Sequence, residues 1–443
     1  MLAAKRSDLR SAVGLVILTG LTGCPAPNHP RGGNARAFTL EVGRPGASLR
    51  GVAGDRDRTF AAFTTTPDTT TDAASSRAAR TTIEARRLAA IAWQVELDGT
   101  AGPLARARDL LAITLGGAPG LRGEPGAVVV ALDASTGAAR WRTAIDSTEW
   151  SVITSIAPAP DGFVVGGTFS GTLRAQAKVV SSAGGSDGFV ARLSTAGDVI
   201  WLVRVGGAGA DSVQGVAASP DRVAIAGTVT GGADLLGQPL PAFDERSPFA
   251  DGFVAELDAA GARRWSATFG GKEDDSVAGV AIDASGRVAV AANARGAVHV
   301  GNSELMAQGP ADGMVIWWQP GGDRGPTILL GGLDFDGLRG IAAVGDRVVV
   351  GGFFSGTMRL GDRAITAGGG DDAFLAALDD SGNTVAGWQV GGEGREDIAA
   401  LAAIPDGFIA GVTHTATAWV EGVPLPAPKH PMSGAALVIR GVP

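Results

Sequence analysis

The sequence predicts an all-β protein whose main part is a β-propeller, a ring of radially arranged four-stranded sheets. One pattern begins six times along the chain at intervals of 60 to 64 residues, and such self-similarity indicates a repeated supersecondary unit. Each complete copy contains four short apolar runs separated by turn residues, which is typical of antiparallel strands. The composition agrees, since 68 glycines interrupt a chain that is 45% hydrophobic.

The chain begins with a pattern typical of an export signal. Residues 1–10 carry Lys5, Arg6 and Arg10, and residues 11–23 form an apolar run. Thirteen residues are too few to span a bilayer as a helix, which takes about 20. They fit the apolar region of a signal peptide. We therefore expect residues 1–23 to be a signal peptide.

The apolar run ends in Leu21, Thr22, Gly23 and Cys24, and Cys24 is the only cysteine of the chain. These four residues resemble the lipobox of bacterial lipoproteins. The resemblance implies cleavage before Cys24, lipidation of its thiol and amine with fatty acyl chains such as palmitate, and a membrane anchor. Two or more acyl chains suffice for stable anchoring. An ordinary signal peptide with an incidental cysteine is the alternative.

Pro25 follows the cysteine, where an Asp in Gram-negative lipoproteins usually signals retention in the inner membrane. By the same resemblance, we expect the protein to be anchored in the outer membrane, where it faces either the periplasm or the outside.

Residues 24–80 are rich in Pro and Gly and then in Thr, Ala, Ser and Asp. Such segments bury too little apolar area to offset chain entropy, so they predict a flexible tether in which only residues 35–43 could form a strand.

The propeller is therefore expected over residues 81–443. Its repeat begins at residues 126, 187, 251, 312, 372 and 434. In the copy that begins at residue 187, the expected strands are 189–193, 199–205, 213–217 and 223–229. A single sheet of four strands leaves one face uncovered, whereas radial stacking of such sheets covers both faces.

The repeat has the form D-G-F-V-A-x-L, then Trp, then G-G-x-x-x-D, and it resembles the repeats of bacterial secreted β-propeller proteins over about residues 80–443. This resemblance implies a propeller in an extracytoplasmic location and implies no particular activity. Three positions depart from the pattern. Gly126 and Gly434 replace the opening Asp, and Ile328 stands where the Trp is expected.

The ends of the repeat array leave the number of blades open. Six blades result if the C-terminal strand at 434–440 completes a first blade built mainly from residues 88–117. Seven result if residues 35–60 supply further strands. In either arrangement, closure of the ring removes exposed sheet edges, which otherwise favour aggregation.

Two sets of acidic residues recur in the repeats. Asp187, Asp251, Asp312 and Asp372 open the units, and Asp211, Asp275, Asp336 and Asp397 follow the Gly-Gly turns. Metal binding or acid–base chemistry is one interpretation. Because every unit carries them, we favour a structural role in which each Asp caps backbone N–H groups of a turn.

The tryptophans fall into two groups. Trp141, Trp201, Trp265 and Trp388 recur at one repeat position and predict packing between blades. Trp150, Trp317, Trp318 and Trp419 lie outside this repeat position and are candidate partner-facing aromatics, with core packing as the alternative.

The most variable part of each unit follows its fourth strand, and such segments usually form the binding side of a repeat protein.

The functional prediction is an outer-membrane lipoprotein that presents its propeller as a binding scaffold for a glycan, polymer or protein. The alternative is a propeller enzyme, quinoprotein-like or glycan-active, with a site on the axis. The sequence offers no metal-ligand spacing, nucleophile motif or phosphate loop, so we expect no cofactor and leave catalysis open. A net charge of −8, about −10 without residues 1–23, argues against nucleic acid. We expect a monomer.

Overall fold

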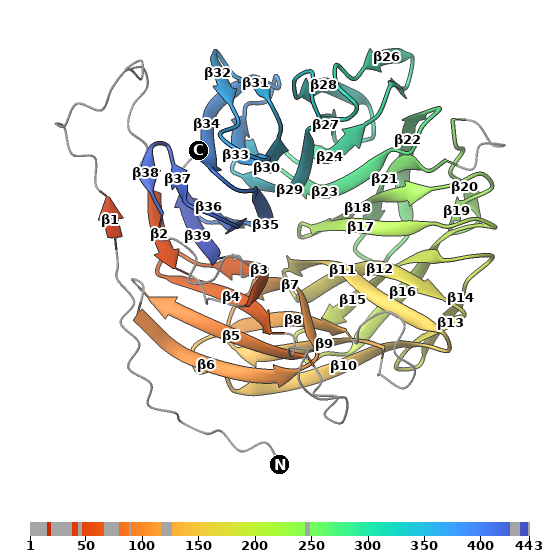
Figure 1. The fold of residues 1–443 in the computed structure, drawn as a ribbon. Helices are drawn as coiled ribbons and strands as arrows, with labels where there is room; N and C mark the ends of the chain where they lie inside the picture. The colour runs from red at the N-terminus through yellow and green to blue at the C-terminus, as the bar shows by residue number, and fades with distance from the viewer. Residues whose placement is uncertain are drawn as a thin grey trace, which may run out of the picture.

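Seven radial sheets surround a central axis in the part of the chain that the structure describes (Figure 1). The computed structural model describes residues 16–18, 38–42, 47–65, 79–87, 90–116, 126–243, 249–425 and 435–441, and only the backbone of 16–18, 38–42 and 435–440. Leu21, Thr22, Gly23 and Cys24 lie outside these ranges. The β-propeller prediction is confirmed.

Blades 1 to 3 come from the N-terminal half of the chain, and their strands are given from the axis outward. Blade 1 contains β3 (Ser48–Gly54), β4 (Arg58–Thr65), β5 (Arg80–Arg87) and β6 (Ala90–Asp98). Blade 2 contains β7 (Thr100–Ala107), β8 (Leu110–Gly116), β9 (Ala127–Asp133) and β10 (Ala139–Ser147). Blade 3 contains β11 (Trp150–Ala159), β12 (Gly162–Ser170), β15 (Asp187–Ser194) and β16 (Val199–Gly206).

Blades 4 to 6 follow in the same order. Blade 4 contains β17 (Ser212–Ala218), β18 (Arg222–Val229), β21 (Asp251–Asp258) and β22 (Arg263–Gly271). Blade 5 contains β23 (Ser276–Ile282), β24 (Val288–Ala294), β27 (Asp312–Trp318) and β28 (Arg324–Leu330). Blade 6 contains β29 (Gly337–Val344), β30 (Arg347–Phe354), β33 (Asp372–Leu378) and β34 (Thr384–Gly392).

Blade 7 joins the two ends of the chain. It contains β35 (Glu396–Ile404), β36 (Gly407–His414) and β39 (Ala435–Gly441), followed by the N-terminal β2 (Phe38–Val42) and β1 (Val16–Leu18). The C-terminal strand β39 lies between β36 and β2, and both pairings are antiparallel. The predicted pairing of this strand with residues 88–117 is therefore wrong, because it completes the last blade together with β2.

In the described part of the chain the blades number seven, which is the alternative count, because residues 38–65 supply β2, β3 and β4. The same strands correct the predicted tether. Part of the segment 24–80 belongs to the propeller, and Phe60 and Phe63 of β4 are almost completely buried. Their apolar run, FAAF, is short and lies beside a Thr-rich stretch, so composition alone concealed a core strand.

Among the described residues, five short hairpins extend the outer edges of the blades. They are β13–β14 (Thr172–Ala175, Lys178–Ser181), β19–β20 (Asp234–Leu235, Gln238–Pro239), β25–β26 (Ala297–Val300, Ser303–Met306), β31–β32 (Thr357–Leu360, Arg363–Thr366) and β37–β38 (Ala418–Val420, Val423–Pro424). Each comes from the connection between the second and third strands of one blade. Four pair with the fourth strand of the preceding blade, and β31–β32 meets blade 5 through an isolated bridge.

The core consists of the layers between neighbouring blades. Second and third strands such as β12 and β15 are buried along almost their whole length, because each blade lies between two others. The sequence repeat is offset from the blade, since the unit that begins at Asp187 supplies two strands to blade 3 and two to blade 4. Every unit thus joins two blades, and the shared core makes the ring continuous.

The two faces of the ring differ. We call the face with the connections between second and third strands and between successive blades the long-loop face. The turn face carries the short turns between first and second and between third and fourth strands. Among the described residues, no helix has the length and apolar character to cross a membrane.

Candidate functional site

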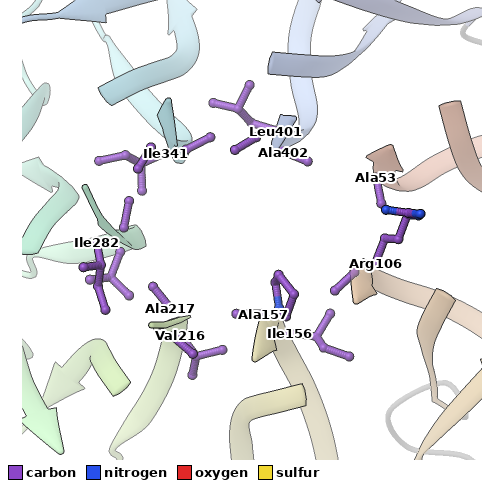
Figure 2. Close-up of a pocket in the computed structure, with 18 of the residues that line it drawn as sticks. Ala53, Arg106, Ile156, Ala157, Val216, Ala217, Ile282, Ile341, Leu401 and Ala402 are labelled. Atoms are coloured by element: carbon purple, nitrogen blue, oxygen red, sulfur yellow. The ribbon is translucent and has the colours of Figure 1, made fainter. Parts of the chain in front are cut away.

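A cavity lies on the axis, at the ends of the inner strands near the turn face. Its volume is about 250 Å³, and all seven inner strands contribute to its lining. Figure 2 shows the small and aliphatic side chains of Ala157, Val216, Ile282 and Ile341 around the opening. The axis therefore carries a mainly apolar surface.

Arg106 of β7 is the one charged residue in the lining of this cavity. Its guanidinium lies along the wall beside Ala53 (Figure 2) and forms an ion pair of 3.3 Å with Asp55. Asp55 is held more closely by Arg58, at 3.0 Å from Nε and 2.9 Å from Nη2. The Nε atom of Arg106 is buried and has no hydrogen-bond partner.

The long-loop face presents exposed apolar side chains. Trp150 and Val152 begin the inner strand β11 and are 44% and 37% exposed. Leu333 and Phe335 lie in the connection that leads to the inner strand β29, and Leu333 is 79% exposed. Aromatic residues of this kind are enriched where proteins bind other proteins.

Buried carboxylate pairs stand behind this face, one member from each set of repeated acids. At Gly206, an added Cβ would lie 2.8 Å from Asp211 Oδ2 and 2.9 Å from Asp187 Cγ, so the two carboxyl groups converge on the glycine. The other pairs are Asp251 with Asp275, Asp312 with Asp336 and Asp372 with Glu396. The fourth member of the second set is therefore Glu396, and the prediction of Asp397 was wrong by one residue.

The carboxylates cap loops, as expected. Asp211 accepts hydrogen bonds from the N–H groups of Gly207 at 2.7 Å and Thr230 at 2.8 Å. Asp187 accepts one from Ala183 at 3.0 Å. These bonds fasten the connection between blades to the connection between second and third strands. Within the described residues, no group of three or more His, Cys, Asp or Glu side chains has metal-binding geometry.

The pairs have unusual titration behaviour. Burial is the main cause that raises the pKa of Asp275 to about 7, and repulsion from Asp251 adds to it. Burial likewise raises the pKa of Asp336 to about 6 and that of Glu396 to about 8, with repulsion from Asp312 and Asp372. Hydrogen bonds from backbone N–H groups oppose the shift at Asp275 and Asp336. A carboxyl with such a pKa is partly or fully protonated near neutral pH.

The candidate aromatic residues separate into two classes. Trp150 is exposed on the long-loop face, and Trp419 is half-buried in the outer strand β37. Trp317 and Trp318 of β27 are almost fully buried, so their prediction as partner-facing residues is wrong. Trp318 packs between blades 4 and 5, and Trp317 packs between blades 5 and 6.

The repeated tryptophans join neighbouring blades, as predicted. Nε1 of Trp141 donates to the carbonyl of Thr195 at 2.8 Å, and Nε1 of Trp201 donates to that of Ala259 at 3.1 Å. In both cases the acceptor lies in a turn of the next blade. Gly197 in such a turn has φ +87°, and an added Cβ would lie 2.7 Å from the ring of Trp141, so only glycine fits there.

The sequence predicts that the variable segments after each fourth sequence strand form the binding side. The structure places most of them in the outer hairpins, where they cover the edges of the preceding blades. Such covering protects a sheet from pairing with other chains. These segments therefore shape the outer edge of the ring, and the residues nearest the axis come from the inner strands.

Sequence reasoning missed Arg106, Val152, Leu333 and Phe335. One signal was available for Arg106. The inner strands share a hydrophobic residue followed by Ala, as in Leu104-Ala105, and the next residue is small or apolar in the other six copies: Gly54, Pro158, Ala218, Ile282, Ala343 and Ala403. A charged residue that breaks this repeat symmetry marks a special position.

Comparison with known proteins finds similar chains among solved structures. No protein-family model and no curated protein matches the chain. Among solved structures, BamB from Moraxella catarrhalis aligns at 15% identity over 90% of this chain and 97% of its own, with a TM-score of 0.36. A europium-containing methanol dehydrogenase aligns at 13% identity over 91% and 93%, with a TM-score of 0.40. The β-propeller domain of the Trilobed protease from Pyrococcus furiosus aligns at 11% identity over 75% and 97%, with a TM-score of 0.35.

Proposed function

We propose that the protein is a propeller scaffold that binds a protein or glycan partner through its long-loop face. One observation carries the proposal. Trp150, Val152, Leu333 and Phe335 are exposed on that face although the chain has ample core to bury them. Their apolar surface is removed from water when a partner covers it, and Trp is among the side chains enriched at the energetically dominant centre of binding surfaces.

The residues on the axis argue against catalysis and in favour of binding. The axial cavity has one charged lining residue, Arg106, whereas acid–base catalysis needs titratable groups that converge on a substrate. The carboxylate pairs are buried and already bonded to backbone N–H groups. No observation within the described residues favours the alternative of a glycan-active or quinoprotein-like enzyme.

The binding proposal is tested with single substitutions on the exposed face. Trp150→Ala and Leu333→Ser should each weaken capture of envelope proteins or polysaccharides by the immobilised full chain, measured by quantitative mass spectrometry and glycan arrays. Val179→Ser is the matched control, because Val179 is 45% exposed but lies on the outer hairpin β13–β14. Equal capture by all three variants and the wild type would contradict a site on this face.

We also propose that Cys24 is lipidated and anchors the propeller in the outer membrane, through the residues between Cys24 and β2. The lipobox resemblance of Leu21, Thr22 and Gly23 supports this anchor. In cell fractionation, we expect the wild type in the membrane fraction and Cys24→Ala in the soluble fraction. A variant that stays in the same membrane fraction rules the anchor out, and surface proteolysis of the wild type shows which side of the membrane it faces.

A further inference from the structure

We propose that the axial cavity binds a small monocarboxylate with an apolar tail, such as a short alkyl carboxylate, whose carboxylate pairs with Arg106. This inference does not depend on the proposed partner surface. The cavity lies toward the turn face, whereas Trp150 and Leu333 lie on the long-loop face.

The lining sets the apolar requirement. The seven inner strands contribute Leu, Ile, Val and Ala side chains that converge on the axis, as Figure 2 shows for Ile156, Val216, Ile282 and Leu401. An alkyl or aryl group gains free energy when it leaves water for such a surface. The volume of about 250 Å³ limits the ligand to a short chain or a single ring.

Arg106 sets the charge requirement. Its side chain is 24% exposed, and its guanidinium lies at the wall of the cavity (Figure 2). The guanidinium is planar and suited to two parallel hydrogen bonds with a carboxylate. A carboxylate in the cavity would pair with the exposed part of the guanidinium and neutralise its charge.

The nearest acid does not already fill this role. Asp55 accepts hydrogen bonds from the backbone N–H groups of Asp57 and Arg58 and from Nε of Arg58. Its contact with Arg106, at 3.3 Å, is the longest of these. Two arginines therefore share one carboxylate, and the group of Asp55, Arg58 and Arg106 carries one excess positive charge beside the cavity.

Repeat symmetry supports a purpose for this arginine. The six positions that correspond to Arg106 in the other inner strands hold Gly, Pro, Ala or Ile. Packing of the ring therefore does not require a charged residue there. The charge points toward a ligand with a single anionic group rather than one with several.

The test is calorimetric titration of the purified full chain with octanoate, octanol and octylammonium. We expect saturable binding of octanoate, weaker binding of octanol and none of octylammonium. Arg106→Gln should weaken octanoate binding about 10-fold or more, since hydrogen bonds to charged groups are among the stronger ones. Arg50→Gln is the matched control, because Arg50 is an exposed arginine on the inner strand β3 outside the cavity lining, and it should leave binding unchanged.

A second variant separates loss of the ligand contact from loss of the fold. Ala342→Leu adds volume inside the cavity and keeps Arg106, and it should also weaken octanoate binding while thermal unfolding still shows a folded protein. The proposal is overturned if the wild type shows no saturable binding, if octanol binds as tightly as octanoate, or if folded Arg106→Gln and Ala342→Leu both bind octanoate like the wild type.

Discussion

At the scale of single residues, the absence of the repeated Trp from blade 5 explains why Trp317 is buried. Ile328 takes the position of the repeated Trp in blade 5, and Trp317 of the neighbouring strand β27 is the residue that fills the space. An added Cβ on Gly382, in the turn of blade 6, would lie 2.8 Å from Ile328 and 3.7 Å from the Trp317 ring. In blade 5 the aromatic ring therefore comes from the third strand, β27, and not from the fourth strand, β28. Trp317 is buried for this reason, although it lies outside the repeated Trp position.

This account predicts different effects for two tryptophans that the sequence treats alike. Trp317→Ala should lower the free energy of unfolding by about 3–5 kcal/mol, because it leaves a cavity between blades 5 and 6. Trp150→Ala should change it by about 0.5 kcal/mol or less, since Trp150 is on the surface. Chemical denaturation of both variants checks this, and equal losses would contradict the assigned positions.

At the scale of elements, the connection between successive blades has the same composition in several copies. It combines two glycines with a carboxylate, as in Gly331, Gly332 and Asp336. An added Cβ on Gly331 would lie 2.4 Å from Asp312 Oδ1, and one on Gly332 would lie 2.2 Å from the carbonyl oxygen of Thr357. The glycines therefore let the carboxylate pair and the outer hairpin β31–β32 approach the end of the blade.

These pairs make the stability of the ring depend on pH. Asp275, Asp336 and Glu396 have folded-state pKa values of about 7, 6 and 8, above the ordinary values of 3.8 and 4.5. The folded state therefore holds protons that the unfolded state has released. The free energy of unfolding should fall as pH rises from about 4 to about 8, and one pKa unit corresponds to about 1.4 kcal/mol.

Urea unfolding at about pH 5, 6.5 and 8 measures this dependence. Asp275→Asn is the informative variant, because its amide oxygen can still accept from the N–H of Arg295 but the side chain no longer titrates. The slope of unfolding free energy against pH should be smaller in the variant. If the unfolding free energy of the wild type stays constant or rises over this pH range, these carboxyl groups do not hold protons in the folded state.

At the scale of the whole molecule, closure depends on both ends of the chain. Blade 7 takes two strands from residues 396–414, a third from β39 and a fourth from β2. The inner strands β3 and β35 lie side by side and close the ring between blades 1 and 7. The N-terminal strands β2, β3 and β4 are therefore part of the ring. β1 lies at the outer edge of blade 7, so cleavage before Cys24 would leave the pairing of β2 and β39 intact.

Three truncations test this closure. A chain that starts at residue 36 should unfold like the full chain, because every strand of the ring from β2 onward is kept. A chain that starts at residue 44 should melt at lower temperature, since loss of β2 exposes β39 as an edge. A chain that starts at residue 81 loses β2, β3 and β4 and should not give a cooperative unfolding transition, contrary to the domain boundary that composition suggests. Circular dichroism melts distinguish these outcomes.

The sequence by itself determined the all-β class, the repeat and the role of its recurring Trp and Asp residues. These are local, periodic signals that depend on strand alternation and turn chemistry. Only the tertiary structure decided the closure, the surface positions and the axial cavity. Trp150 and Trp317 look alike to a pattern search, yet one faces solvent and the other is in the core. Their exposure depends on contacts between blades that are far apart in the chain, and no local pattern encodes these contacts.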